Sequence, residues 1–314
     1  MSDTALILRA GGHDISCREP MLMGIVNATP DSFSDAGLHR SLEQRVSLAH
    51  RLVADGAVFI DIGGESGVTN RPPVAADEEI ERVVPLIERV CAELDVYVSV
   101  DTYKPAVAQA AIAAGACLVN DVSGLRDPEL ADVCAQTGAG LVIMHTRARP
   151  KEKLLDPGYD GRIRADVTSF LAERIAVAVD RGVSEAQIVL DPGPDFAKTP
   201  AQTIDVLAAL ADLRAFARPV LLAVSRKDFI GALTGRAPRD RLAGTLAAIG
   251  HGVQAGAHLL RVHDVAAAHD YLVVRSALRR ELAIAPRLRL DDTVRWQQGD
   301  GPETGAAPLE PLDS

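Results

Sequence analysis

Eight short apolar runs recur along the chain, and a longer segment with helical periodicity follows most of them. The runs are 21–27, 58–63, 96–101, 117–121, 140–145, 187–191, 219–225 and 258–263. They are continuous rather than alternating, as is typical of strands covered on both faces. The Ala-rich segments 41–55, 76–94, 104–115, 164–181 and 238–255 have the spacing of helices. This pattern predicts an α/β fold, a closed (β/α)8 TIM barrel.

An open doubly wound sheet is the alternative arrangement for such a repeat. It usually carries a GxGxxG motif after its first strand, whereas this chain reads VNATPDS there. Four predicted helices are followed by Gly and then a strand, at Gly56, Gly115, Gly138 and Gly256. Glycine just past a helix end takes a left-handed conformation without a Cβ clash. We expect these turns at the end of the barrel where the strands begin, opposite the end where barrel enzymes have their active sites.

The length of 314 residues suits one barrel of about 250 residues with an extension. We predict a single-domain barrel over residues 1–284 and a C-terminal extension over 285–314. From about residue 298 the extension is rich in Gly, Pro and acidic residues, so we expect it to be disordered. Hydrophobic residues make up 47% of the chain and aromatic residues only 4%, which predicts a core of Ala, Val, Leu and Ile.

The net charge of −10 argues against a nucleic-acid partner, because phosphate backbones bind basic faces. The sequence shows neither a signal peptide nor an apolar run of about 18 residues, so we expect a cytoplasmic protein without membrane contact. The four cysteines form no CxxC motif and no His pattern completes a zinc site, which favours reduced thiols.

Polar residues end the predicted strands. They are Asn27, Asp61 with Glu65 beyond it, Asp101, Asn120-Asp121, His145, Asp191, Ser225-Arg226-Lys227, and Arg261, His263 and Asp264. A single Asp in this position is usually a helix N-cap, and we interpret Asp121 and Asp264 in that way. Eight polar strand ends meeting at one barrel mouth predict an active site there.

Two chemical sets can be distinguished at this mouth. The first set offers carboxylates, an amide and an ammonium, which suits a flat heterocycle with alternating donors and acceptors. It consists of Asp101, Asn120, Asp191 and Lys227. The second set suits a phosphorylated leaving group, because Arg pairs with phosphate oxygens and the Asn27 oxygen is of the kind that Mg²⁺ prefers. It consists of Asn27, Arg71, Arg261 and His263.

The segments that carry these residues resemble the dihydropteroate synthase family over residues 20–280. They read MGIVNATPDSFSDAG, FIDIGGES, SVDT, VNDVSG, IMH, LDPG, SRK and RVHDV, in family order. The resemblance implies a transferase of folate biosynthesis. Such an enzyme condenses 6-hydroxymethyl-7,8-dihydropterin pyrophosphate with p-aminobenzoate, releases pyrophosphate, uses Mg²⁺ and forms a homodimer.

The resemblance also implies residue roles, taken motif by motif. The pterin would be held by Asp101, Asn120, Asp191 and Lys227, with Met144 and Phe196 flanking its ring. Pyrophosphate would be bound by Asn27, Arg261 and His263, with Asn27 also on Mg²⁺. The aminobenzoate would lie near Arg71, Pro72 and Ser225. Catalytic roles fall to Lys227, Asp101, Arg261 and His263. We assign no protein nucleophile, because Cys117 begins its strand and so lies at the wrong end.

Three departures from the family pattern lie on the side of the second substrate. The second loop reads ESGVTNRPP instead of ESTRPG, Asp195 and Ala197 replace glycines of DPGIGFGKT, and Asp228 follows SRK. Asp228 either faces an anionic substrate or caps the next helix. Three other functions stay open: a paralogue using another amine or with little activity, a pterin-dependent methyltransferase-type barrel, and a non-catalytic binding protein.

Overall fold

The computed structural model describes residues 6–29, 42–66, 72–155, 158–159, 161–291 and 294. The chain divides into two compact units, Met1–Leu272 and Val273–Ser314. The predicted boundary at 284–285 stays a prediction, and the tail from residue 298 lies outside the described residues. Within the described part of the chain, no helix is both long and apolar enough to cross a bilayer.

The first unit contains a parallel sheet that closes on itself. Its eight strands in the described residues are β3 (Met21–Asn27), β4 (Ala57–Gly63), β5 (Tyr97–Asp101), β6 (Leu118–Asp121), β7 (Gly140–Met144), β8 (Ile188–Asp191), β9 (Leu221–Leu222) and β10 (Leu259–Val262). They pair in the order β8-β7-β6-β5-β4-β3-β10-β9. A parallel bridge between Leu190 and Val220 joins the two outer strands. The predicted (β/α)8 barrel is confirmed.

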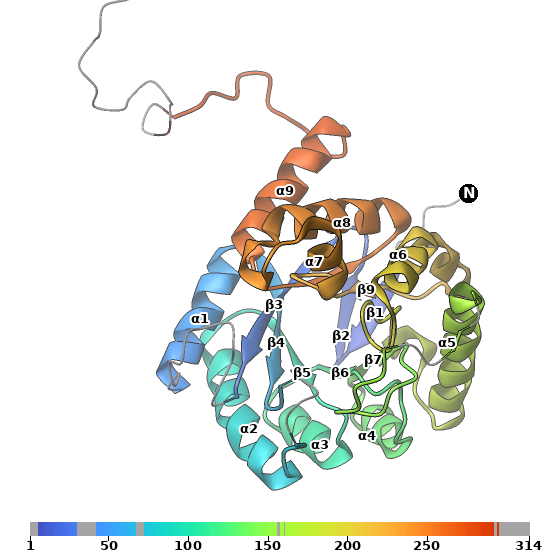
Figure 1. Ribbon diagram of the computed structural model, residues 1–314. Coiled ribbons are helices and arrows are strands. Elements are labelled where there is room, and N and C mark those ends of the chain that lie inside the picture. Colours follow the sequence, from blue (N-terminus) through green and yellow to red (C-terminus); the bar gives the residue numbers. More distant parts are fainter. Residues whose placement is uncertain are drawn as a thin grey trace, which may run out of the picture. The chain divides into compact units, whose positions relative to one another are not determined.

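Helices surround the strands of this unit (Figure 1). They are α1 (Leu42–Ala54), α2 (Ala76–Glu93), α3 (Pro105–Ala113), α4 (Glu129–Thr137), α5 (Ile163–Asp180), α6 (Pro200–Ala208), α7 (Asp228–Thr234) and α8 (Leu242–Ala255), and α9 spans Val265–Leu278. The predicted helices match closely except at 238–255. There Pro238–Asp240 forms a separate 3₁₀ turn, so α8 begins four residues later than predicted. The predicted strand 219–225 is reduced to Leu221–Leu222, with an isolated bridge at Val220 before it.

An N-terminal hairpin, which was not predicted from the sequence, covers the lower end of the barrel. The lower end is the end at which the parallel strands begin. Its strands are β1 (Ile7–Ala10) and β2 (His13–Ser16), joined by Gly11 and Gly12 at φ +58° and +84°. Positive φ at both turn residues matches the right-handed twist of a hairpin. Leu8 packs in one buried cluster with residues at the strand starts, including Leu118 and Leu259. The chemistry is thereby confined to the other end.

The predicted glycine turns at that lower end are confirmed. Gly56, Gly115, Gly138 and Gly256 have φ values of +103°, +116°, +74° and +105°. Each precedes a strand, so the chain turns from helix to strand four times by the same left-handed step.

Candidate active site

The strand register aligns the first polar residues at the upper rim of the barrel. Asn27 pairs with Gly63, Gly63 with Asp101, and Asp101 with Asn120. Three of the predicted binding residues therefore occupy one row across four strands. β3 and β5 end on Asn27 and Asp101, Asn120 of β6 lies at the same level of the ladder, and β4 contributes Gly63 between them.

An ion-paired cluster fills the centre of this rim. Arg261, from β10, donates from Nε to Asp61 Oδ2 at 2.6 Å and from Nη2 to Asp101 Oδ2 at 2.7 Å. Asn120 Nδ2 donates to the same Asp61 oxygen at 3.2 Å. Asp61 is fully buried, and its Oδ1 has no hydrogen-bond partner among the described residues. Sequence analysis placed Asp61 at a strand end but gave it no role, whereas the structure puts it under two binding residues.

The charges of this cluster depend on each other. Burial raises the pKa of Asp101 to about 7; the Arg261 charge opposes this rise, and Asp61 adds to it. Burial alone would lower the pKa of Arg261, but Asp61 and Asp101 hold it above its ordinary value. A guanidinium has five N–H groups. Two of them bind these carboxylates, so Arg261 keeps donors for a further anion.

A second cluster follows β8. Asp191 Oδ1 accepts a bond from the Gly193 amide at 2.7 Å, and burial raises the Asp191 pKa against that bond and the Lys227 charge. Lys227 Nζ lies 4.1 Å from the centroid of the Phe196 ring and donates to the Pro194 carbonyl at 3.1 Å. Burial lowers the Lys227 pKa. A carboxylate, an ammonium and an aromatic face thus lie together, as the prediction for a pterin pocket requires.

Met144 lies beside this second cluster. It pairs with Asp191 in the ladder between β7 and β8 and is 1% exposed. Its place agrees with the predicted position against a bound ring, although a buried methionine at a strand end also serves as core.

Lys198, which was not among the residues predicted from the sequence, holds the loop after β8 from inside. Lys198 is 3% exposed and donates to the carbonyls of His145, Gly193 and Phe196 at 3.2, 2.7 and 3.1 Å. Burial lowers its pKa to about 7. Gly193 has φ +63°, and a Cβ there would meet the His145 oxygen at 2.1 Å, so only glycine fits. The loop that carries Phe196 is therefore rigidly specified.

His263 and Ser225 form a hydrogen-bonded pair after β10 and β9. Ser225 Oγ and His263 Nδ1 are 2.9 Å apart, and the His263 amide donates to the same Oγ at 3.2 Å. Burial and the neighbouring charges of Arg261 and Arg226 lower the His263 pKa to about 4. The imidazole is thus neutral at neutral pH, and in the tautomer whose Nδ1 accepts from Ser225 Oγ, Nε2 carries the proton and can donate it to a ligand.

Asn27 is half-buried at the rim, and in the described residues its side chain makes no hydrogen bond. Its amide oxygen is therefore available to a cation. In that same part of the structure, no three His, Cys, Asp or Glu side chains form a metal cluster. Mg²⁺ commonly takes one or two protein oxygens and shares the ion with phosphate and water, so the donor set fits such an arrangement. Arg71 lies outside the described residues, and Pro72 is exposed.

His145 and Cys117 are unsuited to nucleophilic chemistry. His145 is fully buried, pairs through Nε2 with Asp166 Oδ2 at 2.9 Å, and has a pKa lowered by burial to about 4. Cys117 lies in the buried cluster at the lower end of the barrel, where burial raises its pKa to about 12. Neither residue supplies a base or a thiolate at the mouth.

The residues interpreted as caps differ in outcome. Asp121 accepts bonds from two loop amides, those of Ser123 at 2.7 Å and Leu125 at 2.5 Å, but the N-cap of α4 is Pro128, so the helix-cap interpretation was wrong for Asp121. Asp264 directly precedes α9, as the interpretation requires, but its carboxylate accepts from Arg226 Nε at 3.0 Å and from Nη2 at 2.6 Å.

The cap interpretation was also wrong for Asp228. The N-cap of α7 is Lys227, and Asp228 is the first helical residue. Its side chain is 87% exposed, and its Oδ1 accepts from Arg241 Nη1 at 2.8 Å. The positive charge of Arg241 therefore offsets the negative charge of Asp228 at the first residue of α7.

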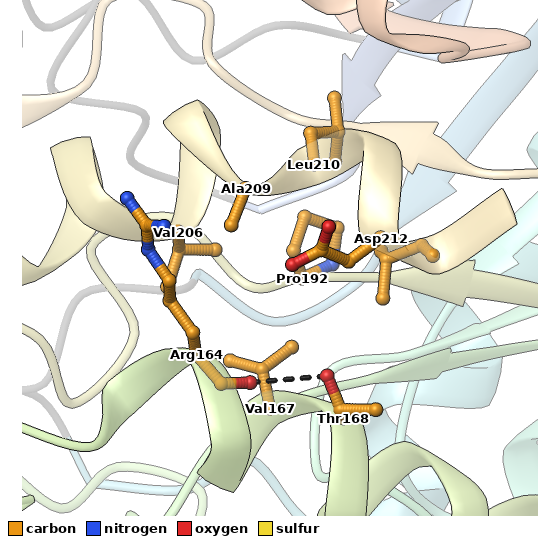
Figure 2. A pocket seen from close by; sticks show the side chains of 9 residues that line it. Arg164, Val167, Thr168, Pro192, Val206, Ala209, Leu210 and Asp212 are labelled. Atoms are coloured by element: carbon orange, nitrogen blue, oxygen red, sulfur yellow. Dashed lines mark hydrogen bonds between the residues drawn. The ribbon is translucent and has the colours of Figure 1, made fainter. Parts of the chain in front are cut away.

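A small crevice also lies on the outside of the barrel, between α5 and the chain that runs from α6 into the 3₁₀ helix η2 (Leu210–Phe216). Figure 2 shows Val167 and Thr168 on one side of it and Leu210 on the other. Its volume of about 10 Å³ has room for no more than a water molecule.

The family model described as pterin binding enzyme matches residues 23–263, which include both clusters of the mouth. The dihydropteroate synthase of Bacillus subtilis is 44% identical over 265 residues, covering 84% of this chain and 90% of that protein. The enzyme of Escherichia coli K12 is 38% identical over 258 residues, covering 82% and 91%. This chain belongs to the dihydropteroate synthase family.

Solved structures agree with this assignment. The dihydropteroate synthase of Xanthomonas albilineans with 4-aminobenzoic acid has a TM-score of 0.80 and 42% identity, over 88% of this chain and 99% of that one. The same enzyme in complex with 7,8-dihydropteroate has a TM-score of 0.78 and 43% identity, over 87% and 98%. The protein is a pterin-binding transferase of folate biosynthesis, as the motifs predicted.

Proposed function

We propose that this protein condenses 6-hydroxymethyl-7,8-dihydropterin pyrophosphate with p-aminobenzoate to give 7,8-dihydropteroate and pyrophosphate. The observation that carries the proposal is the convergence of Asp101, Asn120, Asp191 and Lys227 at one barrel mouth. Relatives named dihydropteroate synthase, whose structures hold 4-aminobenzoic acid or dihydropteroate, support the choice of substrates.

In this proposal the pterin ring lies between the two clusters. Asn120 and the two carboxylates would match donors and acceptors on the ring edge, and Lys227 would donate to an acceptor. Asn120 and Asp191 are buried, and leaving such a group unpaired costs about 1–3 kcal/mol; Asp101 and Lys227 are half-buried. Phe196 and Met144 would bracket the ring faces. A ring with the wrong pattern of donors would leave several buried groups without partners.

The chemistry requires no protein nucleophile. The lone pair of the arylamine nitrogen attacks the exocyclic methylene carbon, the carbon–oxygen bond breaks, and its electron pair leaves with pyrophosphate. The nitrogen then loses a proton to solvent. The N–H groups that Arg261 keeps free would hold the departing phosphate oxygens, with Asn27 and neutral His263 beside them. Mg²⁺ bound at the Asn27 oxygen would screen the charge of pyrophosphate.

The alternatives are less well supported. A methyltransferase-type barrel or a paralogue for another amine would not lead one to expect 38–44% identity to named synthases across the whole barrel. A homodimer and a cytoplasmic location remain part of the proposal on family membership alone. Light scattering would test the dimer, for which the proposal expects twice the mass of 33.2 kDa.

The deciding experiment is pyrophosphate release from the pterin substrate with and without p-aminobenzoate. The proposal expects release that depends on the amine and falls sharply in Lys227→Ala. Thr168→Ala, on the outer face of α5, is the control and should keep full activity. Release that is independent of the amine, or equal in both variants, would contradict the proposal.

A further inference from the structure

Asp195 joins two helices through the loop that carries Phe196. It has φ +62°, in the left-handed region. Its Oδ1 accepts from Thr203 Oγ1 on α6 at 3.0 Å, and its Oδ2 accepts from the Phe229 amide on α7 at 3.2 Å. Its own amide donates back to Thr203 Oγ1 at 3.1 Å. Both oxygens of the carboxylate are thus committed to hydrogen bonds.

The hydrogen bond to the Phe229 amide lies in the first turn of α7. Helices begin with amides that have no acceptor within the helix, and the N-cap of α7, Lys227, provides no side-chain cap. Asp195 supplies the missing acceptor from outside the helix. Since α7 has only seven residues, its start depends on such external contacts.

The same loop also contacts Lys227 directly. The Pro194 carbonyl accepts from Lys227 Nζ at 3.1 Å, and the Phe196 ring lies 4.1 Å below that ammonium. Pro194 and Phe196, the neighbours of Asp195, therefore contact the side chain of Lys227. Asp195 itself binds the backbone amide of Phe229, two residues after Lys227.

We propose that Asp195 is a positioning residue for Lys227, which fixes the start of α7 against the β8–α6 loop and thereby aims the ammonium into the pterin pocket. This extends the proposed function, on which it rests, to a residue outside the pterin contacts. The family motif has glycine at this position. Glycine suits the backbone angle but has no side chain to reach Phe229, so the link is a feature of this chain.

Electrostatics support this assignment. Burial lowers the pKa of Lys227, and the carboxylate that opposes this effect most is Asp195, ahead of Asp191. The other charged or titratable groups that act on or near Lys227 are Asp228, Arg261, Lys198 and His263. Asp195 therefore also helps to keep Lys227 protonated, the form that donates to a pterin.

The test uses Asp195→Gly and Asp195→Asn in the full chain, with Asp132→Asn on α4, where Asp132 pairs with Arg181, as a matched control. Asp195→Gly accepts the backbone angle but loses both links. We expect faster amide exchange over residues 227–231 and about tenfold weaker binding of 6-hydroxymethylpterin, a partial loss of one charged hydrogen bond. Asp195→Asn keeps an acceptor oxygen. It should bind within about threefold at neutral pH, with the basic limb of its binding profile moved to lower pH. Asp132→Asn should change neither property.

Unchanged exchange in Asp195→Gly would overturn the proposal, as would faster exchange with unchanged pterin affinity. The exchange measurement needs no ligand. Failure of the wild-type protein to bind the pterin would instead count against the proposed function, so the two failures are distinguishable. If Asp195→Gly does not fold, the pH profile of Asp195→Asn decides, and an unmoved basic limb refutes the proposal.

Discussion

Replacing Asp61 by Asn tests whether the buried carboxylate organises the pterin pocket. One oxygen of Asp61 accepts from both Arg261 and Asn120, and the other has no partner among the described residues. The amide oxygen of Asn can retain the two accepted bonds. Its NH₂ group then takes the place of the unpaired oxygen and becomes a buried donor without an acceptor.

The magnitude follows from this geometry. Breaking a buried ion pair costs about 3–5 kcal/mol when the remaining charge is left alone, but Arg261 keeps Asp101 as a partner. We therefore expect the cost of one unsatisfied buried group, about 1–3 kcal/mol. If that cost appears in pterin binding, the affinity falls about 5-fold to 150-fold, at 1.4 kcal/mol per tenfold.

The pH dependence separates this role from general destabilisation. Asp61 raises the pKa of Asp101, so its neutralisation should lower that pKa from about 7. Because the carboxylate form of Asp101 accepts bonds from the pterin, the acid limb of pterin binding should move to lower pH in Asp61→Asn. Calorimetric titration from pH 5 to 8 measures both effects, with Asp132→Asn on α4 as control. Unchanged affinity and an unmoved acid limb would refute the reasoning.

Three further predictions concern the charged residues of the mouth. Burial raises the pKa of Asp101 to about 7, so folding favours its protonated form. The stability that Asp101 contributes is therefore full below about pH 4 and is lost as the pH rises to about 7, which lowers the melting temperature. Asp101→Asn should abolish this decrease in melting temperature. Arg261→Ala should weaken pyrophosphate binding by calorimetry at least tenfold more than bare pterin binding, and His263→Ala should do so less, because His263 is neutral. Asp228→Ser should leave kcat/KM for p-aminobenzoate within about twofold, since Asp228 is exposed and paired with Arg241; a clear gain would show that the carboxylate faces the substrate.

Local pattern was sufficient to predict the barrel and its rim. Each apolar run and the polar residue near its end are neighbours in the sequence. The sequence alone therefore placed Asn27, Asp101 and Asn120 at one end of the barrel. The hairpin at residues 7–16 was missed although Gly11 and Gly12 mark its turn, because its strands are short and only one face is buried.

Contacts between distant segments could not be predicted in this way. Asp61 and Arg261 are 200 positions apart, and nothing near either residue shows that they pair. The same is true of Asp195, whose sequence neighbours do not reveal the Phe229 amide on another helix. Neither alternative considered for Asp228 included its partner Arg241, which lies 13 positions further along the chain. Motifs place side chains at the barrel mouth, but only the folded structure shows which charged side chains are paired with each other and which can still bind a substrate.

The most direct test of the central claim is the identity of the product. Purified protein with Mg²⁺, 6-hydroxymethyl-7,8-dihydropterin pyrophosphate and p-aminobenzoate should yield 7,8-dihydropteroate by mass spectrometry, in a one-to-one ratio with pyrophosphate. Lys227→Ala should form little of it, and Asp132→Asn should match the wild type. Pyrophosphate without dihydropteroate, or no turnover by a folded protein that binds the pterin, would contradict the account.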